Sequence, residues 1–312
     1  MVERGGPRHL LTRGRGFARK RSLRLRATVH RMRVRRAWQT LWPGAEPMRM
    51  PFAPGHFYSP IPAPADVDAI PEVDAHATLP GIDLRVEEQV AFLRTLAVTL
   101  PTGPRFSANG YYDDGDAAIY QAIVRTTQPA RVVEVGAGWS TAALFDAAAT
   151  PAVTVIDPDP SRVHDLLRPD DLARCTIVAR RLQDVDLAPL LALEAGDILF
   201  VDSTHVAKHG SDVNRIVLDV LPQLRPGVLV HFHDVLYPFE YPADWFRRGR
   251  HWSEAYLLRA FLACNDTYEI LLWPDLLRRL GRIDDPDLLA AVTVGASAAI
   301  WIRRRGPEPG SG

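Results

Sequence analysis

The sequence predicts an α/β protein with a mostly parallel sheet and helices on both of its faces. From about residue 114 onward, short β-branched segments alternate with segments of helical periodicity, a pattern typical of right-handed βαβ units. Several strand-like segments are apolar throughout, which indicates burial on both faces. Of the 312 residues, 47% are hydrophobic and 24% are charged, which excludes a disordered or collagen-like chain.

The predicted elements follow one another along the chain. Helical segments lie at 86–99, 116–127, 140–149, 161–168, 187–195 and 212–224. Strand-like segments lie at RVVEVG (131–136), VTVID (153–157), CTIVA (175–179), DILFVD (197–202) and GVLVHFHD (227–234). TYEILLW (267–273) and ASAAIWIRR (296–304) look like a closing strand pair, and the stretch between them holds helical turns instead of one long crossover helix.

The formal net charge of the chain is zero, but its N-terminal part is basic and the remainder is acidic. Residues 1–36 hold twelve Arg and Lys20 against the single acid Glu3, so the remainder carries a net charge of −12. Residues 13–38 could contact an anionic membrane surface as a basic amphipathic segment, and a solvated, partly disordered arm is the alternative. An acidic body is a poor partner for nucleic acid.

Composition also predicts how the chain is divided. We expect a basic N-terminal arm (1–42), a Pro-rich strap and helical N-terminal extension (43–106), an α/β domain (107–305) and a disordered tail (306–312). Whether residues 1–47 belong to the natural protein stays open. Two cysteines and no apolar run of about 18 residues favour a cytoplasmic protein, with peripheral membrane contact as an option.

Residues that carry chemistry follow the ends of the predicted strands, where parallel α/β sheets bind ligands. Gly136 and Gly138 allow a sharp turn and a close approach of the backbone to a ligand. Ser140 is placed to cap the helix that follows. Asp157 ends the next strand, 19 residues after Gly138, and can accept both hydroxyls of a ribose. The alternative for Asp157 is a turn role within its Asp-Pro-Asp-Pro run.

Four segments, EVGAGWST, VTVIDPDP, DILFVDSTH and LRPGVLVHFHD, resemble class I S-adenosylmethionine-dependent methyltransferases over about residues 107–303. SDVN (211–214), LPQLRPGVLVHFHD (221–234), PFEYP (238–242) and WSEAYLLRAFL (252–262) are similar to a bacterial branch with small-molecule O-methyltransferase relatives. The resemblance implies a Rossmann-like fold for residues 107–305, with a mostly parallel seven-stranded sheet and an antiparallel last strand.

The resemblance also implies a cofactor site for S-adenosylmethionine. Glu134, Gly136 and Gly138 would line the methionine part of the cofactor, and Ser140 belongs to the same loop. Asp157 would bind the ribose. Gln183 and Asp184 would read the adenine, although Asp184 also suits a plain surface loop. Asp202 would lie near the methyl donor and acceptor.

A second group combines Asp202, His205, His233 and Asp234, which we predict to be catalytic because neighbouring strand ends converge. Asp202, His233 and Asp234 could hold one divalent metal ion such as Mg²⁺. Related enzymes have an acidic pair where this chain has His233-Asp234, so a softer ion and a metal-free site with a histidine base both stay open. His231, deeper on the same face, is predicted to be a core histidine.

The segment LYPFEYPADWFRRGRHW (236–252) is predicted to be a lid over the acceptor, with a loop packed for stability as the alternative. Tyr111 is a further candidate for closing the other side. The predicted acceptor contacts are Tyr112, Tyr237, Glu240, Tyr241, Trp252 and Glu254.

Together these features predict transfer of a methyl group from S-adenosylmethionine to a hydroxyl of a small molecule, such as a sugar, glycolipid or secondary metabolite. Metal assistance is left open. The alternatives are a metal-dependent hydroxylase-like enzyme on the same scaffold, an RNA methyltransferase that uses the basic arm, and a noncatalytic cofactor-binding module. The sequence does not indicate an oligomeric state.

Overall fold

The structure, a computed structural model, describes residues 52, 54–70, 78–100, 109–147, 149, 151–294 and 297–306. The chain divides into two compact units, residues 1–69 and residues 70–312. The predicted basic arm, the membrane contact through residues 13–38 and residues 307–312 of the tail lie outside the described residues. Within the described residues, no helix has both the length and the apolar character needed to cross a membrane.

The described residues of the first unit, 52 and 54–69, include the short helix α2 (Pro64–Asp68). The Asp66 carboxylate accepts a hydrogen bond of 2.9 Å from the Ala63 amide at the start of this helix. Before the helix, aromatic rings stack on one another: the ring centroids of Phe52 and His56 are 4.2 Å apart. Local contacts therefore join the described residues of this unit.

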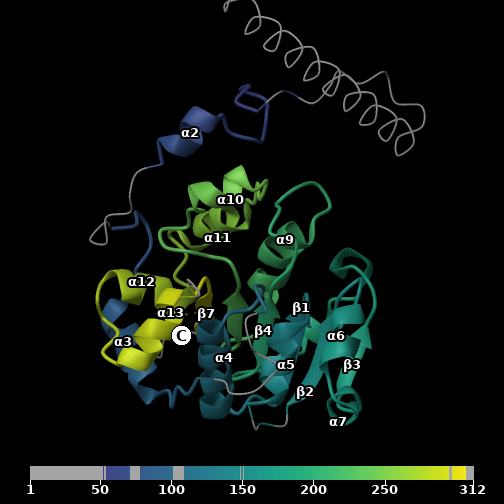
Figure 1. The fold of residues 1–312 in the computed structure, drawn as a ribbon. Helices are drawn as coiled ribbons and strands as arrows, with labels where there is room; N and C mark the ends of the chain where they lie inside the picture. Colours follow the sequence, from purple (N-terminus) through teal and green to yellow (C-terminus); the bar gives the residue numbers. More distant parts are fainter. Residues whose placement is uncertain are drawn as a thin grey trace, which may run out of the picture. The chain divides into compact units, whose positions relative to one another are not determined.

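The second unit is built on a seven-stranded sheet with the strand order β3-β2-β1-β4-β5-β7-β6 (Figure 1). The strands are β1 (Arg131–Val135), β2 (Ala152–Ile156), β3 (Cys175–Val178), β4 (Ile198–Val201), β5 (Leu229–Phe232), β6 (Tyr268–Leu272) and β7 (Ile300–Arg304). Strands β1 to β5 pair in parallel, and β7 runs antiparallel to both β5 and β6. The prediction of a parallel sheet with an antiparallel last strand is confirmed.

Helices fill the connections. The helices predicted over 86–99 and 140–149 end earlier, at Thr95 and Phe145, and two others differ more strongly from the prediction. Those of the second unit are α3 (Val86–Thr95), α4 (Asp114–Thr127), α5 (Trp139–Phe145), α6 (Ser161–Leu166), α7 (Pro169–Leu172), α8 (Ala188–Leu191), α9 (Asp212–Asn214), α10 (Ala243–Arg247), α11 (Glu254–Leu262), α12 (Pro274–Arg279) and α13 (Pro286–Val294), with a 3₁₀ turn η1 (Leu182–Asp184). The helix predicted over 187–195 is only the four-residue α8. The helix predicted over 212–224 continues from α9 as a π-helix, η2 (Arg215–Val220), and ends in a 3₁₀ turn, η3 (Leu221–Gln223). Pro222 lies in that last turn, where it has no amide hydrogen to continue a helical ladder.

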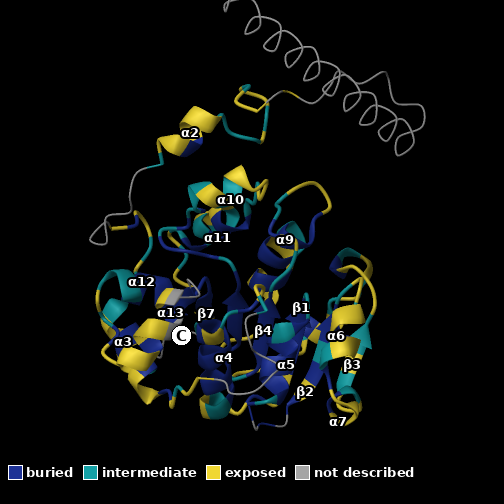
Figure 2. Cartoon of the chain, viewed as in Figure 1, coloured by how far each residue is buried: buried dark blue, intermediate teal, exposed yellow. Residues whose placement is uncertain are grey.

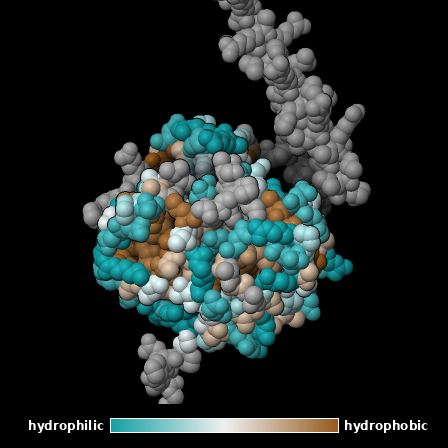
Figure 3. All heavy atoms as spheres, turned by 60° about the horizontal axis from the view of Figure 1, so that its bottom comes forward, coloured by the Kyte–Doolittle hydropathy of each residue, from teal (hydrophilic) through white to brown (hydrophobic). Residues whose placement is uncertain are grey.

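Side chains alternate along the strands and divide the core between the two faces of the sheet. Val132 and Phe200 pack on one face with α4 and α5, whereas Val133 and Leu199 pack on the other with η2 and α11. Figure 2 shows buried strands between helices whose outer turns are exposed. The face drawn in Figure 3 is mostly hydrophilic, and hydrophobic residues are visible between the hydrophilic areas. Helices therefore cover both faces, as predicted.

The segment before the α/β domain is fixed to the sheet of the second unit. The Gln89 side chain of α3 accepts a hydrogen bond of 2.7 Å from the Trp273 amide. The Cys264 amide donates to the Gly81 carbonyl at 2.7 Å. Residues 78–100 are thus bonded to β6 and its flanking loops.

Candidate active site

A glycine turn follows β1 at the point where the strand order of the sheet reverses, between β1 and β4. Gly136 follows β1 with a φ of +80°, and a Cβ placed on it would lie 1.8 Å from the Asp202 carbonyl oxygen. The Asp202 amide donates to the Val135 carbonyl at 2.9 Å, so the ends of β1 and β4 are tied together. Only glycine can lie this close to the Asp202 carbonyl oxygen. The absence of a side chain at position 136 leaves space at the carboxyl ends of the strands, where parallel α/β sheets bind ligands.

A buried acid, Glu134, is linked to the same turn through hydrogen bonds. Glu134 is fully buried, and its two oxygens accept hydrogen bonds from the hydroxyls of Thr141 (2.5 Å) and Tyr120 (3.1 Å). The Thr141 hydroxyl in turn accepts from the Gly138 amide at 3.1 Å. Helix α5 begins at Trp139, so Ser140 lies in its first turn and does not cap it as predicted. Burial raises the pKa of Glu134 to about 7, although both hydroxyl contacts oppose that shift.

A cavity of about 290 Å³ lies beside the glycine turn. It is lined by Val135, Gly136, Ile156, Asp157, Pro158, Arg181, Leu182, Gln183, Asp202, Ser203, Thr204 and Asp212. Four predicted cofactor residues, Gly136, Asp157, Gln183 and Asp202, are among them. Glu134, Gly138, Ser140 and Asp184 do not line it.

The two acids predicted to bind the nucleoside differ in their surroundings. The Asp157 carboxylate accepts hydrogen bonds from the amides of Ala137 (3.1 Å) and Asp159 (2.8 Å), which fix it at the cavity wall with lone pairs left on both oxygens. Asp184 instead forms a bidentate pair with the exposed side chain of Arg181, at 2.8 and 2.9 Å. The Arg181 contact lowers the pKa of Asp184.

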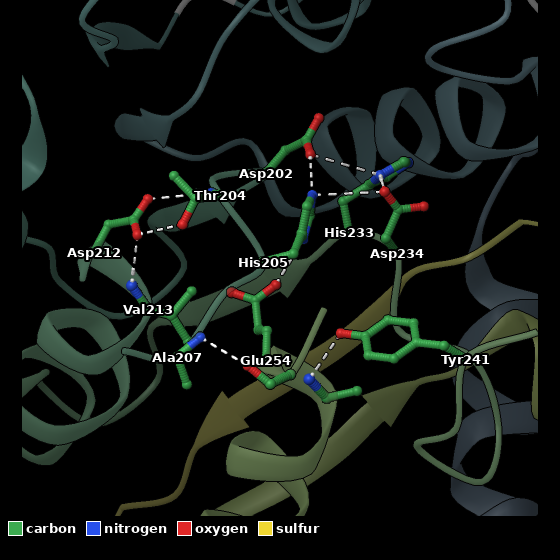
Figure 4. A network of polar contacts seen from close by, with 12 residues as sticks. Asp202, Thr204, His205, Ala207, Asp212, Val213, His233, Asp234, Tyr241 and Glu254 are labelled. Carbon is green, nitrogen blue, oxygen red and sulfur yellow. Dashed lines mark hydrogen bonds and ion pairs between the residues drawn. The ribbon is translucent and has the colours of Figure 1, made fainter. Parts of the chain in front are cut away.

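The four predicted catalytic residues meet at the ends of β4 and β5 (Figure 4). His205 Nε2 lies 3.2 Å from Asp202 Oδ1 and 3.6 Å from Asp234 Oδ2. His233 Nδ1 lies 3.8 Å and 3.5 Å from the same two oxygens. Burial raises the pKa of Asp202, but the charges of the two imidazoles outweigh it and hold that pKa well below its usual range. Asp202 belongs to the cavity as well as to this cluster, so the two sites are continuous.

Glu254, predicted to contact the acceptor, lies on the far side of His205. It is fully buried, and its Oε2 lies 2.9 Å from His205 Nδ1. Burial lowers the pKa of His205, but the hydrogen bonds to Asp202 and Glu254 prevail and raise it to about 10. The backbone of His205 has a φ of +57°, which few non-glycine residues adopt. Its carbonyl accepts from the amides of Ser253 and Glu254, so both ends of the residue are fixed.

Asp116 of α4 is a site residue that the sequence reasoning missed. It is buried, its Oδ2 lies 3.4 Å from His233 Nε2, and its Oδ1 accepts from the Ser297 hydroxyl at 2.6 Å. The charges of Asp234 and Asp202 raise the pKa of His233 well above its usual value, against the effect of burial. An acid in the first turn of a helix is ordinary, and Asp113 and Asp114 stand just before it, so no signal in the sequence distinguishes Asp116.

His231 is a core residue, as predicted. Its ring stacks on Phe200 with centroids 3.9 Å apart and meets the edge of Trp301 at 4.8 Å. Burial lowers the pKa of this imidazole well below its usual value.

Two comparisons decide the family of the chain. The family profile described as "Methyltransferase domain" matches residues 133–235. An Archaeoglobus fulgidus protein, described only as uncharacterized, is 31% identical over 166 residues, which make up 46% of this chain and 74% of that protein. The chain belongs to this family of methyltransferase domains. It is a class I S-adenosylmethionine-dependent methyltransferase, in agreement with the resemblance of its motifs and the order of its sheet.

Solved structures similar to this methyltransferase include two with a bound cofactor or its product. The methyltransferase PaMTH1 of Podospora anserina, bound to S-adenosylhomocysteine, has 15% identity and a TM-score of 0.41 over 74% of this chain and 92% of that one. The O-methyltransferase TomG of Streptomyces achromogenes, bound to S-adenosylmethionine, has 16% identity and a TM-score of 0.40 over 72% of this chain and all of that one.

The segment 236–252, predicted to form a lid, contains α10 and is followed directly by α11. Trp252 lies over the cluster, with its ring 4.3 Å from the His205 ring. Tyr241 is buried, and its hydroxyl accepts from the Ala255 amide at 3.0 Å, at the start of α11. Glu240 accepts from the Tyr256 hydroxyl of the same helix. This segment is therefore bonded to α11.

The remaining predicted acceptor contacts of the methyltransferase fall in different places. Tyr112 is buried with its ring 5.3 Å from that of His233. Tyr237 is buried against Trp273, at 5.4 Å between ring centroids, and lies in the apolar core. Tyr111 is exposed beneath the Arg162 guanidinium at 4.5 Å. Of the predicted contacts, Tyr112, Trp252 and Glu254 directly adjoin the cluster.

Proposed function

We propose that this methyltransferase moves the methyl group of S-adenosylmethionine to a hydroxyl of a small molecule, assisted by a divalent metal ion. The observation that carries the proposal is the position of Asp202, which is part of both the cavity and the carboxylate–imidazole cluster. A hydroxyl bound at the cluster would thereby lie next to a methyl donor bound in the cavity. Positioning of this kind supplies much of the acceleration in two-substrate reactions.

The cavity residues fit the cofactor. Gly136 leaves the crevice free of side-chain atoms, Asp157 offers oriented carboxylate oxygens to ribose hydroxyls, and Gln183 offers an amide to the adenine. When bound, S-adenosylmethionine supplies an electrophilic methyl group. The protein must orient the acceptor oxygen, remove its proton and exclude water.

The cluster residues fit a divalent ion. One ligand atom each from Asp202, His233 and Asp234 lies within 4.8 Å of the others. Both ring nitrogens of His233 are buried without a hydrogen-bond partner, because its contacts with the carboxylates lack hydrogen-bond geometry. A divalent ion held there would lower the pKa of a hydroxyl that binds it.

The electrostatics of the body favour a neutral acceptor. Outside residues 1–36 the chain carries a net charge of −12, which repels polyanions. Trp252 lies over the His205 ring and offers aromatic surface beside the cluster, suited to a sugar or a ring-containing metabolite. We therefore propose an uncharged hydroxyl compound, such as a sugar, glycolipid or secondary metabolite.

A screen of hydroxyl compounds with a labelled methyl donor tests the reaction. We expect label to be transferred to an oxygen atom of a neutral acceptor, and prior treatment with a chelator to reduce the rate by at least about 100-fold because the hydroxyl loses its activating ion. Unchanged transfer after chelation would refute metal assistance and leave the methyltransferase assignment in place. Label found on nitrogen would refute the hydroxyl acceptor.

Calorimetry with S-adenosylhomocysteine tests the cofactor site. We expect Asp157→Ala to weaken binding by about 10- to 100-fold, the loss of about 1.5–3 kcal/mol that hydrogen bonds to a charged group provide. Asp184→Ala is the matched control. The Asp184 carboxylate is not part of the cavity lining, although its partner Arg181 is, so we expect a change of less than about twofold. Equal losses in the two variants would mean that Asp184 also binds the nucleoside.

A further inference from the structure

The two histidines of the cluster share one arrangement, and Figure 4 shows both imidazoles directed toward Asp202 and Asp234. Each directs one ring nitrogen toward Asp202 and Asp234: Nε2 for His205 and Nδ1 for His233. Each places its other nitrogen against a buried carboxylate. His205 Nδ1 lies 2.9 Å from Glu254, and His233 Nε2 lies 3.4 Å from Asp116. Two inner acids, two imidazoles and two outer acids thus form a layered cluster.

The inner distances suit a metal ion. Separations between the imidazole nitrogens and the inner carboxylate oxygens range from 3.2 to 3.8 Å. Bonds of about 2.1 Å at tetrahedral angles place neighbouring ligand atoms about 3.4 Å apart. These four nitrogen–oxygen separations are therefore close to those between neighbouring ligand atoms of one ion.

The outer acids lie where metal-binding imidazoles require a carboxylate: Glu254 is hydrogen-bonded to His205, and Asp116 lies 3.4 Å from His233 Nε2 without hydrogen-bond geometry. A ligating histidine almost always donates its second N–H to a carboxylate or carbonyl, which fixes the ring and increases its basicity. Glu254 and Asp116 are 0% and 4% exposed, and each lies against only one of the two imidazoles. Burying two carboxylates is costly unless each has a specific partner. This arrangement explains why both acids are placed in the core.

We propose that His205 joins Asp202, His233 and Asp234 as a fourth ligand, and that the site takes a transition-metal ion of the zinc or cobalt class in preference to Mg²⁺. This inference rests on the metal-assisted function proposed above. Imidazole nitrogens suit transition metals, whereas Mg²⁺ takes oxygen ligands almost exclusively. Glu254 and Asp116 act as positioning residues that orient the two rings.

Metal titration of the full chain, purified without a histidine tag and treated with chelator, tests the inference. We expect Zn²⁺ and Co²⁺ to bind with a stoichiometry of one and at least about 100-fold more tightly than Mg²⁺. The Co²⁺ complex should show visible absorption bands that nitrogen ligation intensifies. His205→Ala should weaken Zn²⁺ binding at least about 10-fold, whereas the exposed His209→Ala should not change it.

The outer acids are tested separately. We expect Asp116→Asn and Glu254→Gln each to weaken Zn²⁺ binding by about 10- to 100-fold, with the exposed Asp165→Asn as the matched control. Retained binding of S-adenosylhomocysteine shows that each variant is folded. Zn²⁺ affinity that is unchanged in His205→Ala, or Mg²⁺ affinity equal to that of Zn²⁺, would overturn the inference. Cofactor binding without any metal binding would refute the metal site alone, and loss of both in the unmodified chain would refute the proposed function as well.

Discussion

Gly136→Ala is expected to abolish detectable binding of S-adenosylhomocysteine and to lower the free energy of unfolding by about 2–5 kcal/mol. A Cβ at this position would lie 1.8 Å from the Asp202 carbonyl oxygen, which is backbone and cannot turn aside. Relieving such overpacking typically costs about 1–3 kcal/mol, and a non-glycine residue at positive φ adds about 1–2 kcal/mol. The displaced strands are those that carry Asp202 and the cavity wall. Urea denaturation and calorimetry on the same preparation measure both effects.

Gly210→Ala is the matched control for this prediction. Gly210 also has a positive φ, +68°, but a Cβ there would meet nothing within 4 Å. We therefore expect only the conformational cost of about 1–2 kcal/mol and unchanged cofactor affinity. If both variants lost the same stability and neither lost binding, the close contact at Gly136 would not be what shapes the cofactor crevice.

The fold was predictable because its signals are local. β-branched runs such as RVVEVG and DILFVD are short, apolar and separated by helical segments, so each strand could be located without knowing its neighbours. The weaker predictions concerned helices. Neither the π-helical turn at η2 nor the shortness of α8 leaves a periodicity that differs from an ordinary helix.

The candidate site was predictable only where its residues follow strands. Asp202, His233 and Asp234 were found because the ends of neighbouring parallel strands converge. Asp116 and Glu254 lie on helices, and their roles depend on which way α4 and α11 face the sheet. That orientation is set by tertiary packing, so no spacing along the chain indicates it. The same reason explains why the contact between Glu254 and His205 was not predicted.

The buried acid beneath the glycine turn makes the stability of the methyltransferase depend on pH. The ordinary pKa of a glutamate is 4.5, and burial raises that of Glu134 to about 7 in the folded chain. Between these values the folded state holds a proton that the unfolded state has lost, so stability falls as pH rises from about 4.5 to about 7 and then levels off. A shift of this size corresponds to about 3 kcal/mol. We expect Glu134→Gln to remove this decline, measured by urea denaturation between pH 4 and 8.5.

The hydroxyl of Thr141 influences the pH at which the decline in stability ends, because it affects the pKa of Glu134. It donates to Glu134 and thereby opposes the effect of burial on the Glu134 pKa. We expect Thr141→Val to extend the decline in stability to a higher pH, in addition to a uniform loss from the unpaired Gly138 amide. Parallel stability curves for the unmodified chain and Glu134→Gln would mean that Glu134 is ionised in the folded state. In that case the charge would lie directly beneath the glycine turn, and Glu134→Gln should change cofactor affinity at neutral pH instead of stability.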